Sequence, residues 1–229
     1  MKLLIEDDPA RAAAAAARTI SRHLASVVSS RGSATVAFSG GSTPSLMFDA
    51  LVTMDVPWPA VEVFQVDERV AAADDLERNW LTLSQRLLRR VDLPEQQQHP
   101  MPVLAPDLTA AAGSYTEEIA MHAPDGLDVV HLGLGDDGHT ASWPPGDPVV
   151  DAVADVAVVG PYRGRLRMTL TPRAVNRAGL RVWLACGEGK RSALAGLLAR
   201  RTELPASAAR QEADDVVATD EAAAAGIVH

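Results

Sequence analysis

The amino-acid sequence predicts an α/β fold in which helices cover both faces of a mostly parallel β-sheet. Short apolar segments alternate along the chain with longer segments of helical periodicity. Most of the apolar segments are almost continuously hydrophobic, which is typical of strands that are buried on both faces. Strands that alternate with helices favour a parallel sheet, because each helix carries the chain back to the edge from which the next strand starts.

The expected strands are short, and most are followed closely by glycine, proline or charged residues. They cover Ala34 to Phe38, Val61 to Val66, Leu127 to Leu132, Val156 to Val159, Leu166 to Leu170, Leu180 to Ala185 and Val216 to Ala218.

Helices are expected between these strands. The first is Ala-rich and runs from Arg11 to Ser30, with Gly32 as its stop signal. The second has apolar residues every three or four positions from Leu76 to Val91, and Asp74 with Glu77 forms a capping-box pattern at its start. The others are expected over Leu108 to His122, Arg173 to Arg177 and Lys190 to Arg201.

The length and composition indicate one globular domain spanning residues 1–229. Hydrophobic residues make up 47% of the chain and the mean hydropathy is +0.01, which excludes disordered, collagen-like and membrane-spanning classes. The net charge of -9, from 21 basic and 30 acidic residues, argues against a nucleic-acid or anionic-membrane partner.

Cysteine and lysine are both rare in this chain. The single cysteine, Cys186, excludes an internal disulfide and a multi-cysteine metal site. The segment MKLLIEDDPA has acidic residues where a signal peptide would need a basic and then an apolar run, so we expect a cytoplasmic protein. Lys2, in what we expect to be an untethered start, and Lys190 are the only lysines among the 21 basic residues.

The first glycine-rich loop, SGGSTP, follows the expected strand that ends at Phe38. Thr43 is placed to cap a helix and Pro44 suits its first position. Free amides at the positive end of that helix would form a phosphate cradle, although an ordinary strand-to-helix turn is the alternative. The amides concerned are those of Gly40, Gly41, Ser42 and Thr43.

The second loop begins with Asp67, Glu68 and Arg69 directly after a buried strand. Charged residues at the carboxyl end of a parallel strand face the ligand crevice more often than the core. A solvated salt bridge within the turn explains the same pattern.

The third loop, GLGDDGHTASWPPG, satisfies the dinucleotide pattern with Gly133, Gly135 and Gly138. Two aspartates inside the turn would repel a pyrophosphate, so we expect no nucleotide cofactor. Asp137 and His139 instead suit proton transfer, with the carboxylate orienting the imidazole. No ligand cluster of recognised metal spacing accompanies them, and we expect no metal. His131, within an apolar run, is interpreted as a core residue.

The fourth loop, GEGKRSAL, places Lys190 in the first turn of a helix, where a cation is unfavourable. This local cost indicates a phosphate contact, with a solvated lysine as the alternative. Arg163, Arg165 and Arg167 alternate along an expected strand and would share one face that can bind an anion.

In this order, SGGSTP, DER followed by ERNW, GLGDDGHTASWPPG, RMTLT, GEGKRSAL and LPAS resemble the 6-phosphogluconolactonases, in the glucosamine/galactosamine-6-phosphate isomerase superfamily. The resemblance extends from about Ala34 to the last expected strand. Each motif is weak by itself, but the ordered set is specific.

The resemblance implies a modified Rossmann-like three-layer α/β/α sandwich and hydrolysis of a sugar-phosphate lactone, 6-phospho-D-glucono-1,5-lactone, without a cofactor. It implies that His139 is the general base that activates water. We further expect Asp137 to orient His139, and Asp67 to orient substrate hydroxyls or the water. The residues expected to bind the substrate and its phosphate are Gly40, Gly41, Ser42, Thr43, Arg69, Asn79, Arg167 and Lys190.

One departure separates this chain from the family pattern. After GHTA the family usually reads SLFPG, whereas this chain reads SWPPG, so Trp143 and Pro144 are expected to reshape the floor of the pocket. Related deaminases carry a glutamate at the position of Pro144, which cannot transfer a proton. A sugar-phosphate isomerase or deaminase and a non-catalytic sugar-phosphate sensor are the alternative functions. The assembly is expected to be a monomer or a small homo-oligomer.

Overall fold

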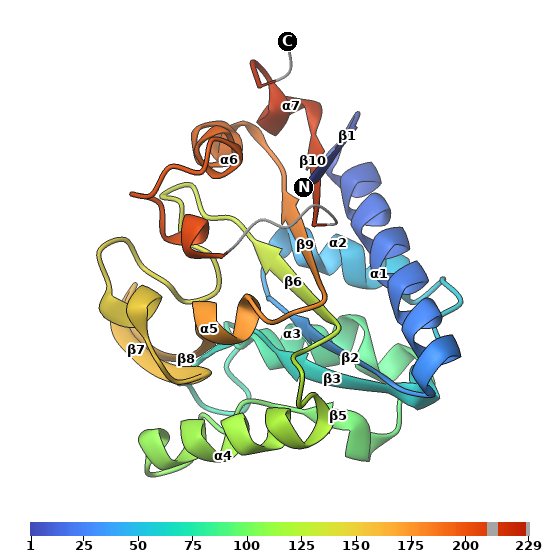
Figure 1. Cartoon of the computed structure of the whole chain (residues 1–229), viewed down its shortest axis with the longest axis vertical. Coiled ribbons are helices and arrows are strands. Elements are labelled where there is room, and N and C mark those ends of the chain that lie inside the picture. The colour runs from blue at the N-terminus through green and yellow to red at the C-terminus, as the bar shows by residue number, and fades with distance from the viewer. Residues whose placement is uncertain (210–214, 228–229) are drawn as a thin grey trace.

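The computed structural model describes residues 1–209 and 215–227, in which seven strands form one parallel sheet of order β1-β10-β9-β6-β2-β3-β5 (Figure 1). Every pairing between neighbours in this sheet is parallel. Its strands are β1 (Lys2–Glu6), β2 (Ala34–Phe38), β3 (Val61–Gln65), β5 (Gln98–His99), β6 (Val129–Gly133), β9 (Leu180–Ala185) and β10 (Val216–Asp220).

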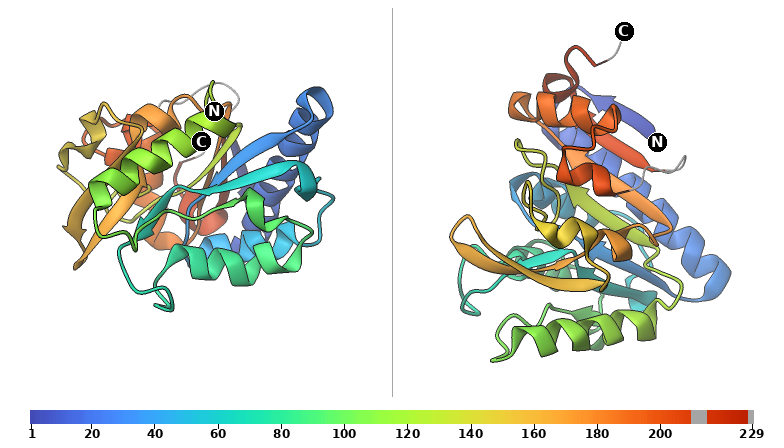
Figure 2. Two further views of the ribbon diagram at one scale, coloured as in Figure 1. Left: turned by 90° about the horizontal axis from the view of Figure 1, so that it is seen from below. Right: turned by 60° about the vertical axis from the view of Figure 1, so that its left-hand side comes forward.

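Helices cover both faces of this sheet (Figure 2). One face packs against α1 (Pro9–Arg31), α2 (Ser42–Leu51) and α3 (Asn79–Arg86). The other packs against α4 (Leu108–His122), α5 (Pro172–Val175), α6 (Arg191–Leu198) and α7 (Glu221–Ala224). The predicted three-layer α/β/α sandwich is therefore confirmed. Short 3₁₀ turns join these elements: η1 (Trp58–Ala60), η2 (Leu88–Arg90), η3 (Glu95–Gln97), η4 (Pro148–Asp151), η5 (Glu188–Lys190) and η6 (Pro205–Ala208).

Apolar residues predominate in the central strands because successive side chains enter opposite layers. In β9, Val182 and Leu184 pack with α1 and α2, whereas Trp183 and Ala185 pack with the helices of the other face. All four are almost fully buried. Continuous hydrophobic runs are thus what this architecture requires of its strands.

The first helix follows the rules of helix termination. Asp8 caps α1 by accepting a hydrogen bond from the amide of Arg11 at 2.8 Å. Gly32 ends the helix in the left-handed conformation at φ 85°, as its position in the sequence predicts. No helix within residues 1–209 or 215–227 has the length and apolar character needed to cross a membrane.

A second, antiparallel sheet lies outside the mostly parallel sheet that the sequence predicts. It has the order β4-β8-β7, with β4 (Asp67–Arg69), β8 (Arg165–Leu170) and β7 (Val156–Tyr162). The link between β7 and β8 is a tight turn, and so short a link permits antiparallel pairing alone. The sheet pairs Arg167 with Arg69.

The predicted start of the second helix is wrong. The helix α3 begins at Asn79, and the apolar periodicity before it belongs to a loop in which Leu76 is 83% exposed. Asp75, rather than Asp74, accepts a hydrogen bond from the amide of Glu77, and the Glu77 carboxylate pairs with Arg165 at 2.8 Å. The side chain of Glu68, in β4, caps α3 in place of the predicted capping box.

The N-terminal segment is tethered, contrary to expectation. Lys2 begins β1, which pairs in parallel with β10 at the edge of the sheet. The amide of Lys2 donates to the carbonyl of Asp215 at 2.6 Å. Strand β1 was missed because its apolar run, LLI, is short and is flanked by charges.

The order of the strands reverses between β2 and β6. From β2 the chain proceeds to β3 on one side, whereas β6 leads to β9 and β10 on the other. Such a switch point leaves a crevice at the carboxyl ends of the two strands, because the loops that follow them turn away in opposite directions.

His131, in the middle of β6, is a core residue as predicted. It is fully buried beside Phe38, and neither ring nitrogen has a hydrogen-bond partner within the described residues. Burial lowers the pKa of His131 to about 3.

This buried imidazole predicts acid sensitivity. Between pH 6.5 and about 3 the unfolded chain binds a proton at His131 that the folded chain does not, so unfolding becomes easier as the pH falls. We expect His131→Leu to remove up to about 1.4 kcal/mol per pH unit from the slope of the unfolding free energy, measured by urea titration. Phe38→Leu, which alters the same packing but keeps the imidazole, should retain the slope. An identical slope in His131→Leu and in the unsubstituted protein would contradict this prediction.

Candidate active site

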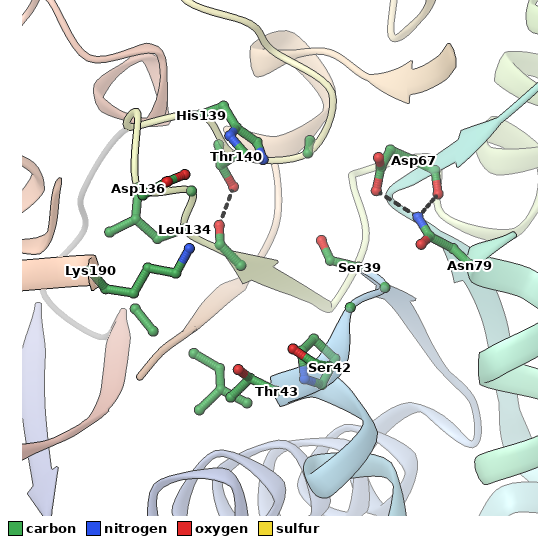
Figure 3. Close-up of a pocket in the computed structure, with 18 of the residues that line it drawn as sticks. Ser39, Ser42, Thr43, Asp67, Asn79, Leu134, Asp136, His139, Thr140 and Lys190 are labelled. Carbon is green, nitrogen blue, oxygen red and sulfur yellow. Dashed lines mark hydrogen bonds between the residues drawn. The ribbon is translucent and has the colours of Figure 1, made fainter. Parts of the chain in front are cut away.

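A pocket of about 310 Å³ opens at the switch point, at the carboxyl ends of the parallel strands (Figure 3). Its lining includes every residue that the sequence predicted for the site except Asp137. The predicted residues that line it are Gly40, Gly41, Ser42, Thr43, Asp67, Arg69, Asn79, His139, Arg167 and Lys190.

The loop after β2 forms the floor of this pocket. Gly41 has a φ of 127° and precedes α2, whose first residue is Ser42. Thr43 therefore lies inside the helix and does not cap it, contrary to prediction, and no side chain caps α2. The uncapped amides at this positive helix end face the pocket, as an anion site requires.

Gly40 is needed because Asn79 occupies the space beside it. A β-carbon at Gly40 would lie 1.9 Å from Oδ1 of Asn79. Any larger residue would displace that amide, which connects two charged residues of the pocket. The Nδ2 group of Asn79 donates to Oδ1 of Asp67 at 3.1 Å, and its Oδ1 accepts from Arg69.

Glu68 points away from the pocket, into the core, which corrects the expectation that all three charged residues of the DER segment face the crevice. Its side chain is fully buried. The carboxylate accepts hydrogen bonds from the amides of Asn79 and Trp80, each at 2.8 Å, and so caps α3 from outside the helix. It also accepts from the amide of Arg69 at 2.8 Å and from Nε2 of Gln65 at 3.0 Å.

Asp67 is a fixed and almost buried carboxylate at the pocket wall. Its Oδ2 accepts a hydrogen bond from the hydroxyl of Ser142 at 2.6 Å and lies 3.8 Å from Nη1 of Arg167. Burial lowers the pKa of Arg167, and Asp67 acts in the opposite direction. Asp67 is thus oriented by three neighbours before any ligand enters.

The third loop is a tight turn and not a dinucleotide-binding loop. The amide of Gly135 donates to the carbonyl of His139 at 2.7 Å, and no helix follows in the described residues up to η4. A β-carbon on Gly135 would lie 2.0 Å from Nδ1 of His139. The glycine is therefore explained by the close packing of the histidine, without a pyrophosphate.

Nδ1 of His139 is hydrogen-bonded to Oδ1 of Asp137. With the proton on Nδ1 donated to Asp137, Nε2 is left as the basic nitrogen of the ring. Burial acts to raise the pKa of Asp137, but hydrogen bonds from His139 and Tyr162 outweigh it and hold that pKa well below the usual range of a carboxyl group. Asp137 is therefore an ionised partner for the imidazole.

Tyr162 is a site residue that sequence reasoning missed. Its hydroxyl donates to Oδ2 of Asp137 at 2.7 Å and lies 3.1 Å from Nδ1 of His139. Burial and the contact with Asp137 raise the pKa of Tyr162 to about 12, so the phenol stays protonated and remains a donor. The one available signal was its position immediately before the three alternating arginines.

The three arginines after Tyr162 line a second cavity of about 440 Å³, which shares several lining residues with the pocket. Arg165 and Arg167 lie in β8, whereas Arg163 lies in the turn before it, so the predicted common strand face does not include Arg163. Arg163 lies 3.5 Å from both Asp136 and Asp137, and Arg165 pairs with Asp75 at 3.0 Å.

Lys190 enters the pocket from the side opposite Asp67 and Asn79 (Figure 3). It ends the 3₁₀ turn that precedes α6, and the helix begins at Arg191, one residue later than predicted. Cys186 also lines the pocket, and burial together with Asp220 raises the pKa of its thiol to about 12. The Cys186 thiol is therefore a poor nucleophile.

Trp143 and Pro144 do not form the pocket floor, contrary to expectation. Trp143 is fully buried, and its indole nitrogen donates to the carbonyl of Leu170 at 2.7 Å. Neither residue lines the pocket. Ser39, which the sequence analysis did not select, does line it, and its buried hydroxyl has no partner among the described residues.

Residues 7–218 of this chain match the sequence profile of the glucosamine-6-phosphate isomerase/6-phosphogluconolactonase family, so the chain belongs to this family. Within the family, a similar protein is the 6-phosphogluconolactonase of Synechocystis sp., which is 36% identical over 187 residues, or 79% of this chain and 78% of that protein.

Solved structures agree with this assignment. The 6-phosphogluconolactonase from Trypanosoma cruzi superposes with a TM-score of 0.87 at 28% identity, covering 100% of this chain and 97% of that one. A monomeric glucosamine-6-phosphate deaminase also superposes with a TM-score of 0.87, at 19% identity over 98% of this chain and 99% of its own. The fold alone therefore does not separate the two activities.

The contact between Tyr162 and Asp137 predicts a measurable change in titration. Tyr162→Phe removes one of the hydrogen bonds that lower the pKa of Asp137, so this pKa should rise toward the ordinary value of 3.8. Carbon-detected NMR titration of the Asp137 carboxyl group measures this shift. Tyr115→Phe, at the only other tyrosine, should leave the Asp137 titration unchanged. Superimposable Asp137 curves for Tyr162→Phe and the unsubstituted protein would show that the hydroxyl does not act on Asp137.

Proposed function

We propose that this chain hydrolyses 6-phospho-D-glucono-1,5-lactone to 6-phospho-D-gluconate, the second step of the oxidative pentose phosphate pathway. The observation that carries the proposal is His139 in the wall of the pocket, with Nδ1 held by Asp137 and Nε2 left basic. The 6-phosphogluconolactonases to which the chain is similar support the choice of substrate.

The chemical step in this proposal needs one base and an electrophilic carbonyl. His139 removes a proton from water as the water oxygen attacks the lactone carbonyl carbon. The tetrahedral oxyanion then collapses, the ring C–O bond breaks, and the imidazolium returns its proton to the leaving alkoxide. Backbone amides or a nearby cation of the pocket stabilise the oxyanion, and Asp67 orients the water or the sugar hydroxyls.

The phosphate end of the substrate is assigned to the cations of the pocket. Lys190, Arg69 and Arg167 lie around the uncapped amino end of α2. Because the net charge of the chain is -9, attraction of an anionic substrate depends on this local cluster. Binding of the remote phosphate fixes the orientation of the lactone ring over His139.

Each alternative function differs from lactone hydrolysis in the groups that it needs in the pocket. A deaminase of this fold needs a carboxylate for ring opening, and at the corresponding position this chain has Pro144, which lies outside the pocket. A sensor needs no oriented base, whereas His139 is held by both Asp137 and Tyr162. The monomer or small homo-oligomer, the single domain and the cytoplasmic location remain predictions.

The decisive experiment is a coupled assay on freshly made 6-phosphogluconolactone, corrected for spontaneous hydrolysis. We expect turnover above background by the unsubstituted protein, and no ammonia from glucosamine 6-phosphate. His139→Ala should lower kcat by about 10²- to 10⁴-fold with little change in KM, because it removes the base but not the binding groups. The absence of turnover above background would overturn the proposed activity, and a wild-type kcat in His139→Ala would remove His139 from the mechanism.

The phosphate assignment predicts a different kinetic signature. Lys190→Ala should raise KM by about 10- to 150-fold, which corresponds to about 1.5–3 kcal/mol for a lost hydrogen bond to a charged group. Lys190→Arg, which keeps the charge, should recover part of the affinity. The matched control is Lys2→Ala, which removes the only other lysine, an exposed residue in β1. An unchanged KM in Lys190→Ala would place the phosphate elsewhere.

A further inference from the structure

Three side chains from separate elements lie close together outside the pocket. Their elements meet where α4 lies beside β5, the edge strand of the sheet (Figure 1). Glu62 lies near the amino end of β3, His99 ends the edge strand β5, and His122 is the last residue of α4. None of the three lines the pocket at the carboxyl ends of the strands. The proposed hydrolysis uses none of them.

Their potential ligand atoms converge on one point. All lie within 4.8 Å of one another. Nε2 of His99 is 2.8 Å from Oε2 of Glu62, and Nδ1 of His122 is 3.6 Å from Oε1 of the same carboxylate. Tetrahedral Zn²⁺ with bonds of about 2.0–2.1 Å places its ligands about 3.3 Å apart. The observed separations fall on either side of that value, so small side-chain movements suffice to complete the geometry.

A fourth residue fixes the orientation of the His99 ring. Oε1 of Glu118 lies 2.7 Å from Nδ1 of His99, on the side of the ring away from Glu62. A carboxylate at Nδ1 holds the proton there and leaves the lone pair of Nε2 for a cation, as carboxylate-histidine-zinc triads do. Phe64 stacks on the ring at 4.3 Å with an interplanar angle of 10°, which restricts its rotation.

The arrangement calls for positive charge between the rings and Glu62. A neutral His99 has one N–H, and with that proton directed to Glu118 the lone pair of Nε2 faces a carboxylate oxygen at 2.8 Å, which is repulsive. A cation shared with the neighbouring His122 imidazole would remove this repulsion. The centroids of the His99 and His122 rings lie 4.7 Å apart, which is close enough for both imidazoles to bind one metal ion.

We infer that Glu62, His99 and His122 form a Zn²⁺-binding site, with Glu118 as a positioning residue. Two imidazoles and a carboxylate are ligands that Zn²⁺ prefers. His99 is almost buried, while His122 and Glu118 are partly exposed, so the ion reaches the site from solvent. A bound ion would tie the two-residue edge strand β5 to β3 and to the end of α4.

This cluster cannot be predicted from the sequence, because its three ligands have no motif spacing. They stand at positions 62, 99 and 122, and only the fold brings them together. The inference is independent of the proposed hydrolysis, and its test uses no substrate.

The test uses the full chain without an affinity tag, treated with EDTA and then freed of the chelator. We expect one Co²⁺ per chain to bind with visible absorption bands, Zn²⁺ to displace it, and Zn²⁺ to raise Tm. His122→Gln should weaken Zn²⁺ binding by about 100-fold or more, and Glu118→Gln by about 10- to 100-fold. His122→Arg places a positive charge beside Glu62 but cannot bind metal, so its Tm should not respond to Zn²⁺.

Two controls locate the ion. His139→Ala tests the active-site histidine and His23→Gln tests a histidine of α1, and both should bind as the unsubstituted protein does. Circular dichroism confirms that each variant is folded. No saturable binding, a Zn²⁺-induced rise in Tm of His122→Arg equal to that of the unsubstituted protein, or binding lost in His139→Ala but kept in His122→Gln would each overturn the inference.

Discussion

The buried carboxylate of Glu68 is the interaction on which the active site depends. An ion inside the core is costly unless its oxygens are fully hydrogen-bonded, and here three backbone amides and two side chains, those of Gln65 and Arg78, surround it. Since neighbouring side chains of a strand point in opposite directions, fixing Glu68 in the core turns Asp67 and Arg69 toward the pocket. The same carboxylate starts α3, which places Asn79 between them.

Two glycines have a matching role, because each leaves room for a functional side chain to approach the backbone. Gly40 makes space for Asn79, and Gly135 makes space for the ring of His139. The loop formally matches the dinucleotide-binding pattern, but its glycine allows the His139 imidazole to pack against a tight turn. The chemistry of such a loop is decided by what packs on its glycines, not by their spacing alone.

The parallel sheet and most of the pocket could be predicted, because continuous apolar strands must be buried and their carboxyl ends must meet. What could not be predicted depended on the directions of single side chains. The sequence does not show that Glu68 turns inward or that Tyr162, in the β7–β8 hairpin, contacts Asp137 in the loop after β6. The misplaced start of α3 has the same cause: its cap comes from a strand, and a local capping pattern at Asp74 and Glu77 competed with it.

The pairing of β1 with β10 has a consequence for the order of folding. Lys2 pairs with Val216, so this edge of the sheet joins segments separated by most of the chain. Closing so large a loop is entropically expensive and contributes to slow, late assembly, whereas β2 and β3 are joined by a single short helix and its flanking turns. During synthesis β1 emerges before the other strands of this sheet, yet its partner β10 is made long after it. The central strands, whose carboxyl ends form the pocket, can thus assemble before β1 pairs with β10 at the edge of the sheet.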